Sequence, residues 1–329
     1  MKSKERRTKP LEGRVAVVAG ATRGAGRGIA CMLGEAGATV YCTGRSTREK
    51  KFARRRGKSS AFELERRPET IEETAEMVSA RGGVGIYARV DHTDEAQVKS
   101  LFKRVKREQG RLDVLVNDVW GGDALTEWKP FWTLSLEKGL EMLRRAVFSH
   151  IITSRHAAPL MVEQKRGLIV EITDGDGLYY RGTLFYDLVK LTAIRLAFDM
   201  SEELRRHKVA AIAVTPGYLR SEAMLEHLGV TEENWREGAK ENPSFIESET
   251  PFFVGRAVAA LAADGKVLKK TGKVLSSWNL SREYGFTDVD GRVPRIAEWV
   301  QENMPDFLKN VRDAERRFRE VGSIFATPS

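Results

Sequence analysis

A tyrosine and a lysine four residues apart, Tyr186 and Lys190, are the pair in this chain with the clearest chemical potential. On a helix this spacing brings both side chains to one face, about 5–6 Å apart at Cβ. A phenol normally keeps its proton until about pH 10, and a neighbouring ammonium group favours the phenolate and so lowers its pKa. The pair is therefore expected to move a proton to or from a substrate oxygen near neutral pH.

A glycine-rich turn near the N-terminus predicts a bound nucleotide. Gly20, Gly24 and Gly26 follow the apolar run 14–19 and precede a helical pattern. Glycines at such a turn let the backbone approach a diphosphate, and the N-terminus of the following helix offers it free N–H groups. Because the turn lies between a strand and a helix, it is a strong signal. Together with Tyr186 and Lys190 it predicts hydride transfer.

The end of the second predicted strand indicates which nicotinamide cofactor binds. Chains that prefer NAD usually carry an acidic residue there for the ribose 2′-hydroxyl, but residues 41–45 read Tyr-Cys-Thr-Gly-Arg. Arg23 in the turn and Arg45 after the strand are suited to hold a 2′-phosphate. We therefore predict NADP(H) in preference to NAD(H). Asp91, after the third predicted strand, either hydrogen-bonds the adenine or caps the next helix, and the sequence favours neither reading.

The elements that must position these residues follow from the apolar pattern. Apolar runs alternate with helical patterns, which is typical of βαβ units around a parallel sheet. The predicted strands are 14–19, 38–43, 84–90, 112–117, 167–173, 209–215 and 272–276, and the longest predicted helices are 136–163 and 184–207. We predict one NADP-binding catalytic domain over residues 11–278, with a basic insertion at 46–67 and a charged extension at 279–329.

The formal net charge of +9 is concentrated in two segments. Residues 45–67 carry ten Lys or Arg against three Glu, and residues 1–14 carry six basic residues against two acidic ones. Such a run can bind nucleic acid or an acidic membrane surface, but a solvated loop beside a phosphate site is the better interpretation. A nucleic-acid partner is therefore not expected.

Composition also bounds the compartment and the chemistry. No apolar run is long enough to span a bilayer. Only two cysteines occur, Cys31 and Cys42, and neither has a metal-ligand or redox spacing, which favours the cytoplasm. The histidines in the predicted helices have no partner spacing that suggests a metal site either, namely His150, His156 and His207. No metal is therefore expected.

The chain resembles the short-chain dehydrogenase/reductase family over about residues 11–278. The resemblance rests on the order of the glycine turn, Asn117, Tyr186 with Lys190, and Pro216 with Gly217. It implies a doubly wound parallel seven-stranded sheet in three α/β/α layers (a Rossmann fold), a homodimer or homotetramer, and reversible hydride transfer between NAD(P) and a carbonyl or alcohol.

The same resemblance implies roles for individual residues. Tyr186 would give its proton to the carbonyl oxygen in reduction, and Lys190 would lower its pKa and bind the nicotinamide ribose. Asn117 would belong to the cofactor site. The loop after the sixth strand would contact the nicotinamide amide, through Pro216, Gly217 and Ser221.

Three positions depart from the family pattern. Trp120 stands where a glycine is usual, Asp174 takes the place of the serine that polarises the carbonyl, and Ala146 is the nearest residue to a usual asparagine. An ionised Asp174 cannot donate a hydrogen bond, and its charge would raise the pKa of Tyr186. Three outcomes remain open: Thr173 supplies the hydroxyl, a protonated Asp174 donates, or the protein binds cofactor with little turnover.

Aromatic residues are concentrated in the loops after the fourth and fifth predicted strands, namely Trp120, Trp128, Phe131, Trp132, Tyr179 and Tyr180. The carboxyl ends of such strands face the ligand crevice, so these rings form either a wall for an apolar or aromatic carbonyl compound or a dimer interface. The leading hypothesis is an NADP(H)-dependent oxidoreductase. The alternatives are a sensor or regulatory partner that binds cofactor without efficient catalysis, and a nucleic-acid or membrane-surface binder.

Overall fold

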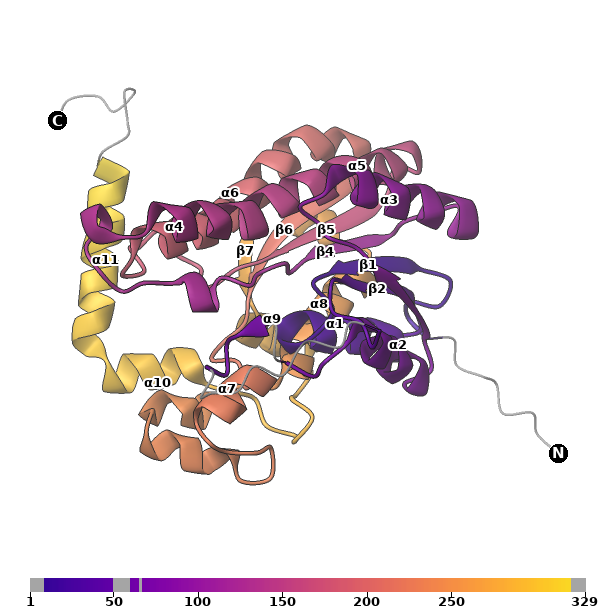
Figure 1. Ribbon diagram of the computed structural model, residues 1–329. Helices are drawn as coiled ribbons and strands as arrows, with labels where there is room; N and C mark the ends of the chain where they lie inside the picture. The colour runs from indigo at the N-terminus through magenta and orange to yellow at the C-terminus, as the bar shows by residue number, and fades with distance from the viewer. Residues whose placement is uncertain (1–8, 50–59, 65–66, 321–329) are drawn as a thin grey trace.

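Seven parallel strands form one sheet in the computed structural model, which describes residues 9–49, 60–64 and 67–320 (Figure 1). The strands are β1 (Val15–Ala19), β2 (Thr39–Gly44), β3 (Val84–Arg89), β4 (Val114–Asn117), β5 (Gly167–Ile172), β6 (Val209–Thr215) and β7 (Val274–Ser276). Their order is β3-β2-β1-β4-β5-β6-β7, and each neighbouring pair is parallel. The predicted doubly wound sheet is confirmed, and its order reverses between β1 and β4, where ligands of such sheets bind.

Helices cover both faces of the sheet (Figure 1). One face carries α1 (Gly24–Glu35), α2 (Ile71–Ala80), α8 (Pro251–Ala263) and α9 (Ser277–Tyr284), and the other carries α3 (Glu95–Gln109), α4 (Leu136–Leu143), α5 (Ser149–Glu163) and α6 (Leu184–Leu204). Successive side chains of a strand point to opposite faces. In β1, Ala16 and Val18 therefore join the core beneath α1 and α8, while Val15 and Val17 join the core beneath α3 and α5. Two buried faces explain why central strands such as β1 and β6 are almost entirely apolar.

The segment predicted as one long helix over 136–163 contains a change of helix type. A π-helical stretch, Arg144–Phe148, joins α4 to α5. Such π-bulges occur often at functional sites, and this one includes Ala146, the residue nearest the expected asparagine. The prediction of one regular helix was therefore wrong over these five residues.

The last part of the described chain folds back over the carboxyl edge of the sheet. The short helix α7 (Glu222–His227) follows β6, and α10 (Ile296–Asn303) and α11 (Pro305–Glu320) follow α9. Figure 1 shows α10 and α11, in yellow, at the side of the molecule where α7 and α4 lie. None of the helices in the described ranges is long and apolar enough to cross a membrane.

Candidate active site

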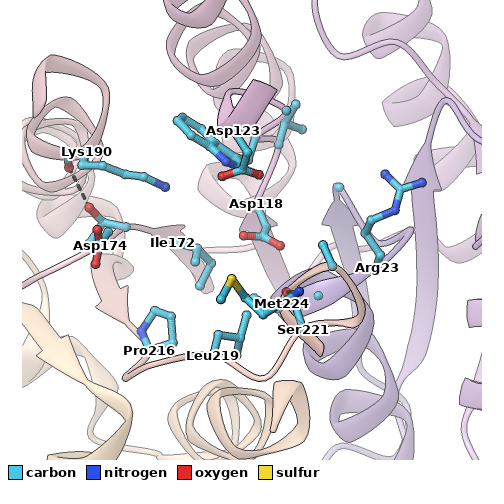
Figure 2. A pocket seen from close by; sticks show the side chains of 18 of the residues that line it. Arg23, Asp118, Asp123, Ile172, Asp174, Lys190, Pro216, Leu219, Ser221 and Met224 are labelled. Carbon is cyan, nitrogen blue, oxygen red and sulfur yellow. Dashed lines mark hydrogen bonds between the residues drawn. The ribbon is translucent and has the colours of Figure 1, made fainter. Parts of the chain in front are cut away.

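A cavity of about 870 Å³ opens at the carboxyl ends of the strands. Its lining runs from the glycine turn, past Tyr186 and Lys190, to α10 and α11. Figure 2 shows Arg23 on one side of it and Lys190 with Asp174 on the other, while Asp118 lies between them. The cavity includes every predicted site residue except Gly26 and Asn117.

Two glycines of the turn, Gly20 and Gly26, are packed too closely for side chains. Gly20 has a φ of +92°, and a Cβ there would lie 2.4 Å from the carbonyl oxygen of Asp118. A Cβ at Gly26 would lie 2.4 Å from the carbonyl oxygen of Gly20, so Gly26 packs the turn against the helix instead of lining the cavity. This packing leaves the N-terminus of α1 facing the cavity through Gly24. A cradle of this kind suits the diphosphate of a dinucleotide.

A carboxylate from another part of the chain lies at this helix N-terminus. The backbone N–H of Gly24 donates to Glu222 Oε2 at 2.8 Å, and Arg27 Nη1 lies 3.7 Å from Glu222 Oε1. Glu222 is the first residue of α7, directly after Ser221. An anion is therefore already held where a diphosphate would bind.

Arginines gather at the far end of the cavity, beyond β2. Arg23 and Arg67 both bond the buried carboxylate of Glu69, at 3.1 Å and 2.6 Å. Burial acts to raise the pKa of Glu69, but the hydrogen bonds and charge of Arg67, with the charge of Arg23, outweigh it and lower the pKa. The ionised Glu69 balances one arginine, and Arg67 also pairs with Glu226, whose Oε2 lies 2.7 Å from Arg67 Nη1. Sequence reasoning did not single out Arg67, because nothing in the basic run distinguishes it.

Arg45 and Asp91 face each other at the same end. Arg45 Nη1 lies 3.8 Å from Asp91 Oδ2, while Asp91 Oδ1 accepts from the backbone and hydroxyl of Thr93. The N-terminus of α3 is capped by Asp94, whose side chain accepts from two backbone N–H groups. The reading of Asp91 as that cap was therefore wrong, and Asp91 lines the cavity instead.

Tyr186 donates its hydroxyl hydrogen to Asp174 Oδ2 over 2.5 Å. Burial raises the pKa of Tyr186 far above its ordinary value, and the charge and hydrogen bond of Asp174 raise it further. The expectation that Lys190 would lower this pKa is not met, because burial and the bonded Asp174 carboxylate both raise the pKa of Tyr186. Lys190 Nζ lies 5.5 Å from the centre of the Tyr186 ring.

Lys190 is held by Trp120, the residue that stands where a glycine was expected. The Nζ atom lies 4.0 Å from the centre of the indole ring, which is cation–π distance. The same indole meets the Tyr186 ring edge-on at a centroid distance of 5.6 Å. Trp120 thus contacts both members of the pair.

Thr173 does not present its hydroxyl to the cavity as a donor. The hydroxyl donates to the backbone carbonyl of Lys190 at 2.6 Å and so ties the end of β5 to α6. Asp174 itself is exposed. The apolar enclosure that would favour a protonated Asp174 is therefore missing. Neither donor proposed from the sequence has the surroundings it needs.

Asn117 and Asp118, at the end of β4, differ in their surroundings. Asn117 is fully buried and donates to Ser154 Oγ and Glu171 Oε1 at 2.8 Å and 2.6 Å, so it supports the cavity floor without lining it. Asp118 lines the cavity, and burial raises its pKa to about 7, although Lys190 and the N–H of Gly26 act in the opposite direction. Near neutral pH a large fraction of Asp118 therefore carries a proton.

The loop after β6 borders the cavity through Pro216, Gly217 and Ser221. The Ser221 hydroxyl oxygen accepts from the N–H of Met224 and caps α7. Behind the loop, the buried Glu249 accepts from the N–H of Gly217 at 2.9 Å and from the Ser277 hydroxyl at 2.6 Å. No pattern in the sequence pointed to Glu249.

The apolar wall of the cavity comes largely from the C-terminal helices. Ile296, Val300, Met304 and Phe307 line it, with Trp278 from α9. Phe307 also meets the ring of Tyr179 edge-on at 6.2 Å. Of the six aromatic residues predicted for this wall, Trp120 lines the cavity, whereas Trp128, Phe131, Trp132 and Tyr180 are exposed.

A parallel sheet with a glycine cradle at its switch point, and a tyrosine and a lysine one helical turn apart in the same cavity, defines a dinucleotide-dependent oxidoreductase. The family model for short chain dehydrogenase matches residues 50–231. The chain belongs to the short-chain dehydrogenase/reductase family. It is thus an NAD(P)-dependent oxidoreductase that acts on CH–OH and C=O groups.

Two relatives are similar over most of their length. Dehydrogenase/reductase SDR family member 1 of Mus musculus is 38% identical, covering 91% of this chain and 95% of the relative. The Homo sapiens protein of the same name is 37% identical, covering 86% and 85%. A crystal structure of a putative dehydrogenase from Xanthomonas campestris shares the fold with a TM-score of 0.68 and 19% identity, covering 86% of this chain and 94% of the other.

Proposed function

We propose that the protein is an NADP(H)-dependent oxidoreductase in which Tyr186 transfers the proton and Lys190 assists it. The observation that carries this is the place of the Tyr186 hydroxyl, in the same cavity as the glycine turn and one helical turn from Lys190. The nicotinamide supplies or accepts the hydride at the substrate carbon. In reduction, Tyr186 gives its proton to the carbonyl oxygen. In oxidation, it takes the proton of the alcohol.

Asp174 can accept the hydroxyl proton of Tyr186. Because the pKa of Tyr186 is raised, a free phenolate is costly in this cavity. When Tyr186 accepts the alcohol proton, its own hydroxyl proton can pass along the 2.5 Å bond to the Asp174 carboxylate. Tyr186 and Asp174 then act as a relay, and the tyrosine remains neutral. In reduction, Tyr186 gives its proton to the carbonyl oxygen, and the exposed Asp174 passes a proton taken up from solvent back to Tyr186.

The test is NADPH consumption with a panel of aromatic aldehydes and ketones. Tyr186→Phe is expected to lower kcat by about 10²-fold or more, the usual contribution of a positioned general acid. Tyr180→Phe is the matched control, because Tyr180 is an exposed tyrosine in the preceding loop and does not line the cavity. Equal loss in both variants, or none in Tyr186→Phe, would contradict the assigned role.

The preference for NADP(H) is supported by the arginines beyond β2 and by the absence of an acidic residue at the end of that strand. Arg45→Ala is expected to weaken NADP binding by about tenfold and to change NAD binding little, since only NADP carries the 2′-phosphate. Arg48→Ala is the control, because Arg48 is exposed and pairs with Glu76. Tighter binding of NAD than of NADP by the natural protein would refute the preference.

A second candidate function is a cofactor-binding sensor or regulatory partner with little turnover. Two observations favour this candidate. Asp174 is an exposed acceptor in the serine position, and the Trp120 ring lies against the Lys190 ammonium group. Tight NADPH binding without turnover of any compound in the panel would support this candidate. The nucleic-acid or membrane alternative depends on residues 45–67, which lie partly outside the described residues. Those arginines of the segment that are described form ion pairs, namely Arg45, Arg48 and Arg67.

We also propose that the chain forms a homodimer or homotetramer in the cytoplasm. The outer sides of α4, α5 and α6 and of the π-helical stretch expose apolar side chains, namely Leu136, Leu140, Phe148, Ile151, Leu188 and Phe198. An apolar face of this kind on a globular protein is typical of an interface. Both cysteines are free and buried, which fits a reducing compartment. Phe148→Asp is expected to shift the mass measured by light scattering towards the monomer.

A further inference from the structure

The residue in the serine position of this site is an acceptor of hydrogen bonds where the family pattern has a donor. Asp174 Oδ2 accepts the hydroxyl of Tyr186 at 2.5 Å, and the carboxylate is exposed to the cavity. A substrate oxygen bound to Tyr186 must therefore lie beside a carboxylate. The oxygen of a simple carbonyl compound carries a partial negative charge and has no hydrogen to donate to this carboxylate.

The nearby cations are engaged elsewhere. Arg181 donates to the backbone carbonyl of Asp174 at 2.7 Å, but its guanidinium pairs with Asp187 at 3.0 Å. Lys190 directs its ammonium group to the Trp120 ring. Among the residues that the structure describes, no donor bonds the Oδ1 atom of Asp174. This oxygen is therefore a free acceptor next to the reacting position.

We infer that Asp174 selects substrates that carry a hydrogen-bond donor on the carbon next to the reacting one, such as an α-hydroxy ketone or the corresponding vicinal diol. The inference rests on the proposed function, because it takes Tyr186 as the group that holds the reacting oxygen. The neighbouring hydroxyl of such a substrate donates to the Asp174 carboxylate, and the Tyr186 hydroxyl turns its one hydrogen from Asp174 Oδ2 to the reacting carbonyl oxygen. A site that bonds a substrate hydroxyl discriminates strongly against the analogue that lacks it, because the group in the site is then left unpaired.

The rest of the cavity defines the other part of the substrate. Val300, Met304 and Phe307, with Trp278, present apolar surface in the same cavity as Asp174. An apolar pocket with a few convergent polar groups holds a ligand by its body and orients it by its polar end. The substrate class is thus an apolar or aromatic compound with adjacent oxygen functions at one end.

The experiment compares 2-hydroxyacetophenone with acetophenone, which differ only in the neighbouring hydroxyl. Their binding to the full-length protein loaded with NADP⁺ is measured by quenching of tryptophan fluorescence, since Trp120 and Trp278 line the cavity. The natural protein is expected to bind the hydroxy ketone at least about tenfold more tightly. Asp174→Ser, which restores a hydroxyl donor, should reduce the ratio to near one. Asp176→Asn should keep it, because Asp176 is an exposed acid two residues away that does not line the cavity.

The readouts separate this inference from the proposed function. Equal affinity of the natural protein for the two probes, the same preference in Asp174→Ser, or no binding of either probe would overturn the selection by Asp174. Turnover of both ketones without a preference would leave the oxidoreductase function standing and refute the inference. A binding preference that Asp174→Ser removes, without NADPH turnover, would support the recognition and count against catalysis.

Discussion

His150 and Glu171 form a buried pair beneath the loop that follows β4, with 2.6 Å between Nδ1 of the histidine and Oε2 of the glutamate. Nε2 of the same histidine lies 3.1 Å from the carbonyl oxygen of Val119. A carbonyl oxygen only accepts, so Nε2 carries a hydrogen. The 2.6 Å contact needs one more proton, held by either the imidazole or the carboxyl group. The pair is therefore neutral as a whole.

This pair supports the wall next to the proposed catalytic residues. Glu171 Oε1 accepts from Asn117, and His150 holds Val119, the residue before Trp120. Trp120 in turn contacts Lys190 and Tyr186. Both ring nitrogens of His150 and both carboxylate oxygens of Glu171 are bonded, and a satisfied buried pair of this kind makes its surroundings rigid. The position of Trp120 is thus expected to depend on the pair.

His150→Leu is predicted to lower the free energy of unfolding by about 3 kcal/mol, because it leaves the buried Glu171 without its proton partner. The double variant His150→Leu with Glu171→Leu should be less destabilised than this single variant, since both partners are then apolar. Urea unfolding measures both values. Additive losses in the double variant would show that the two residues are not coupled.

The effect on the site is separated from general destabilisation by Asp113→Asn. Asp113 is a buried acid that accepts the N–H of Val15, at the opposite end of the strand that ends in Asn117. Both variants should be less stable, but we expect only His150→Leu to lower kcat by about tenfold, a change of about 1.4 kcal/mol. Equal kcat values in the two variants would mean that the pair has no influence on the site.

The fold and the central pair of this site were predictable because their signals are local. Tyr186 and Lys190 share one helix, and central strands such as β1 and β6 are almost entirely apolar. The surroundings of the pair depend instead on contacts between distant segments. The Glu222 carboxylate accepts from the backbone N–H of Gly24, which is 198 residues away in the sequence. Phe307 lines the cavity from α11, and no motif in the sequence connects that helix with the site.

Side-chain direction was the other feature that residue type alone could not predict. Thr173 and Asp174 are neighbours at the end of β5, and either could have presented an oxygen to the substrate. The backbone there turns the Thr173 hydroxyl towards the carbonyl of Lys190 and the Asp174 carboxylate towards Tyr186. Similarly, nothing in the apolar pattern of 136–163 indicates the π-helical stretch, because its side chains continue the same buried face.

Glu222→Gln is predicted to tighten NADP binding. The carboxylate of Glu222 holds the N–H of Gly24, so the diphosphate must displace it and meets its negative charge. Glutamine keeps an oxygen that can accept from Gly24 but removes the charge, worth up to about 1 kcal/mol at a helix N-terminus, or roughly fivefold in Kd.

The measurement is fluorescence titration with NADPH at low and high salt, with the gain expected to shrink as salt screens the charge. Glu233→Gln is the matched control, because Glu233 is an exposed acid that follows α7 and does not line the cavity. Weaker binding in Glu222→Gln would mean that the carboxylate belongs to the cofactor site as an acceptor. The idea that it competes with the diphosphate would then be wrong.

Glu249 is predicted to make stability fall as the pH rises. Burial raises its pKa to about 8, while the hydrogen bonds from Ser277 and Gly217 act in the opposite direction. In the unfolded chain the same carboxyl group titrates near its ordinary value of 4.5. At pH values between these two pKa values, the Glu249 carboxyl group binds its proton more strongly in the folded protein than in the unfolded chain. The contribution of this group is therefore fully present below the unfolded pKa and is lost as the pH rises through the folded one.

The comparison with Glu249→Gln isolates this group, because glutamine keeps the shape and an accepting oxygen but does not titrate. Relative to that variant, the natural protein should lose at most about 1.4 kcal/mol of unfolding free energy per pH unit between pH about 5 and 8. Urea unfolding across this range gives the difference, with the exposed Glu241→Gln as control. Parallel pH profiles for the natural protein and Glu249→Gln would show that Glu249 stays ionised. The hydrogen bonds from Gly217 and Ser277 would then be strong enough to keep the buried Glu249 carboxylate ionised.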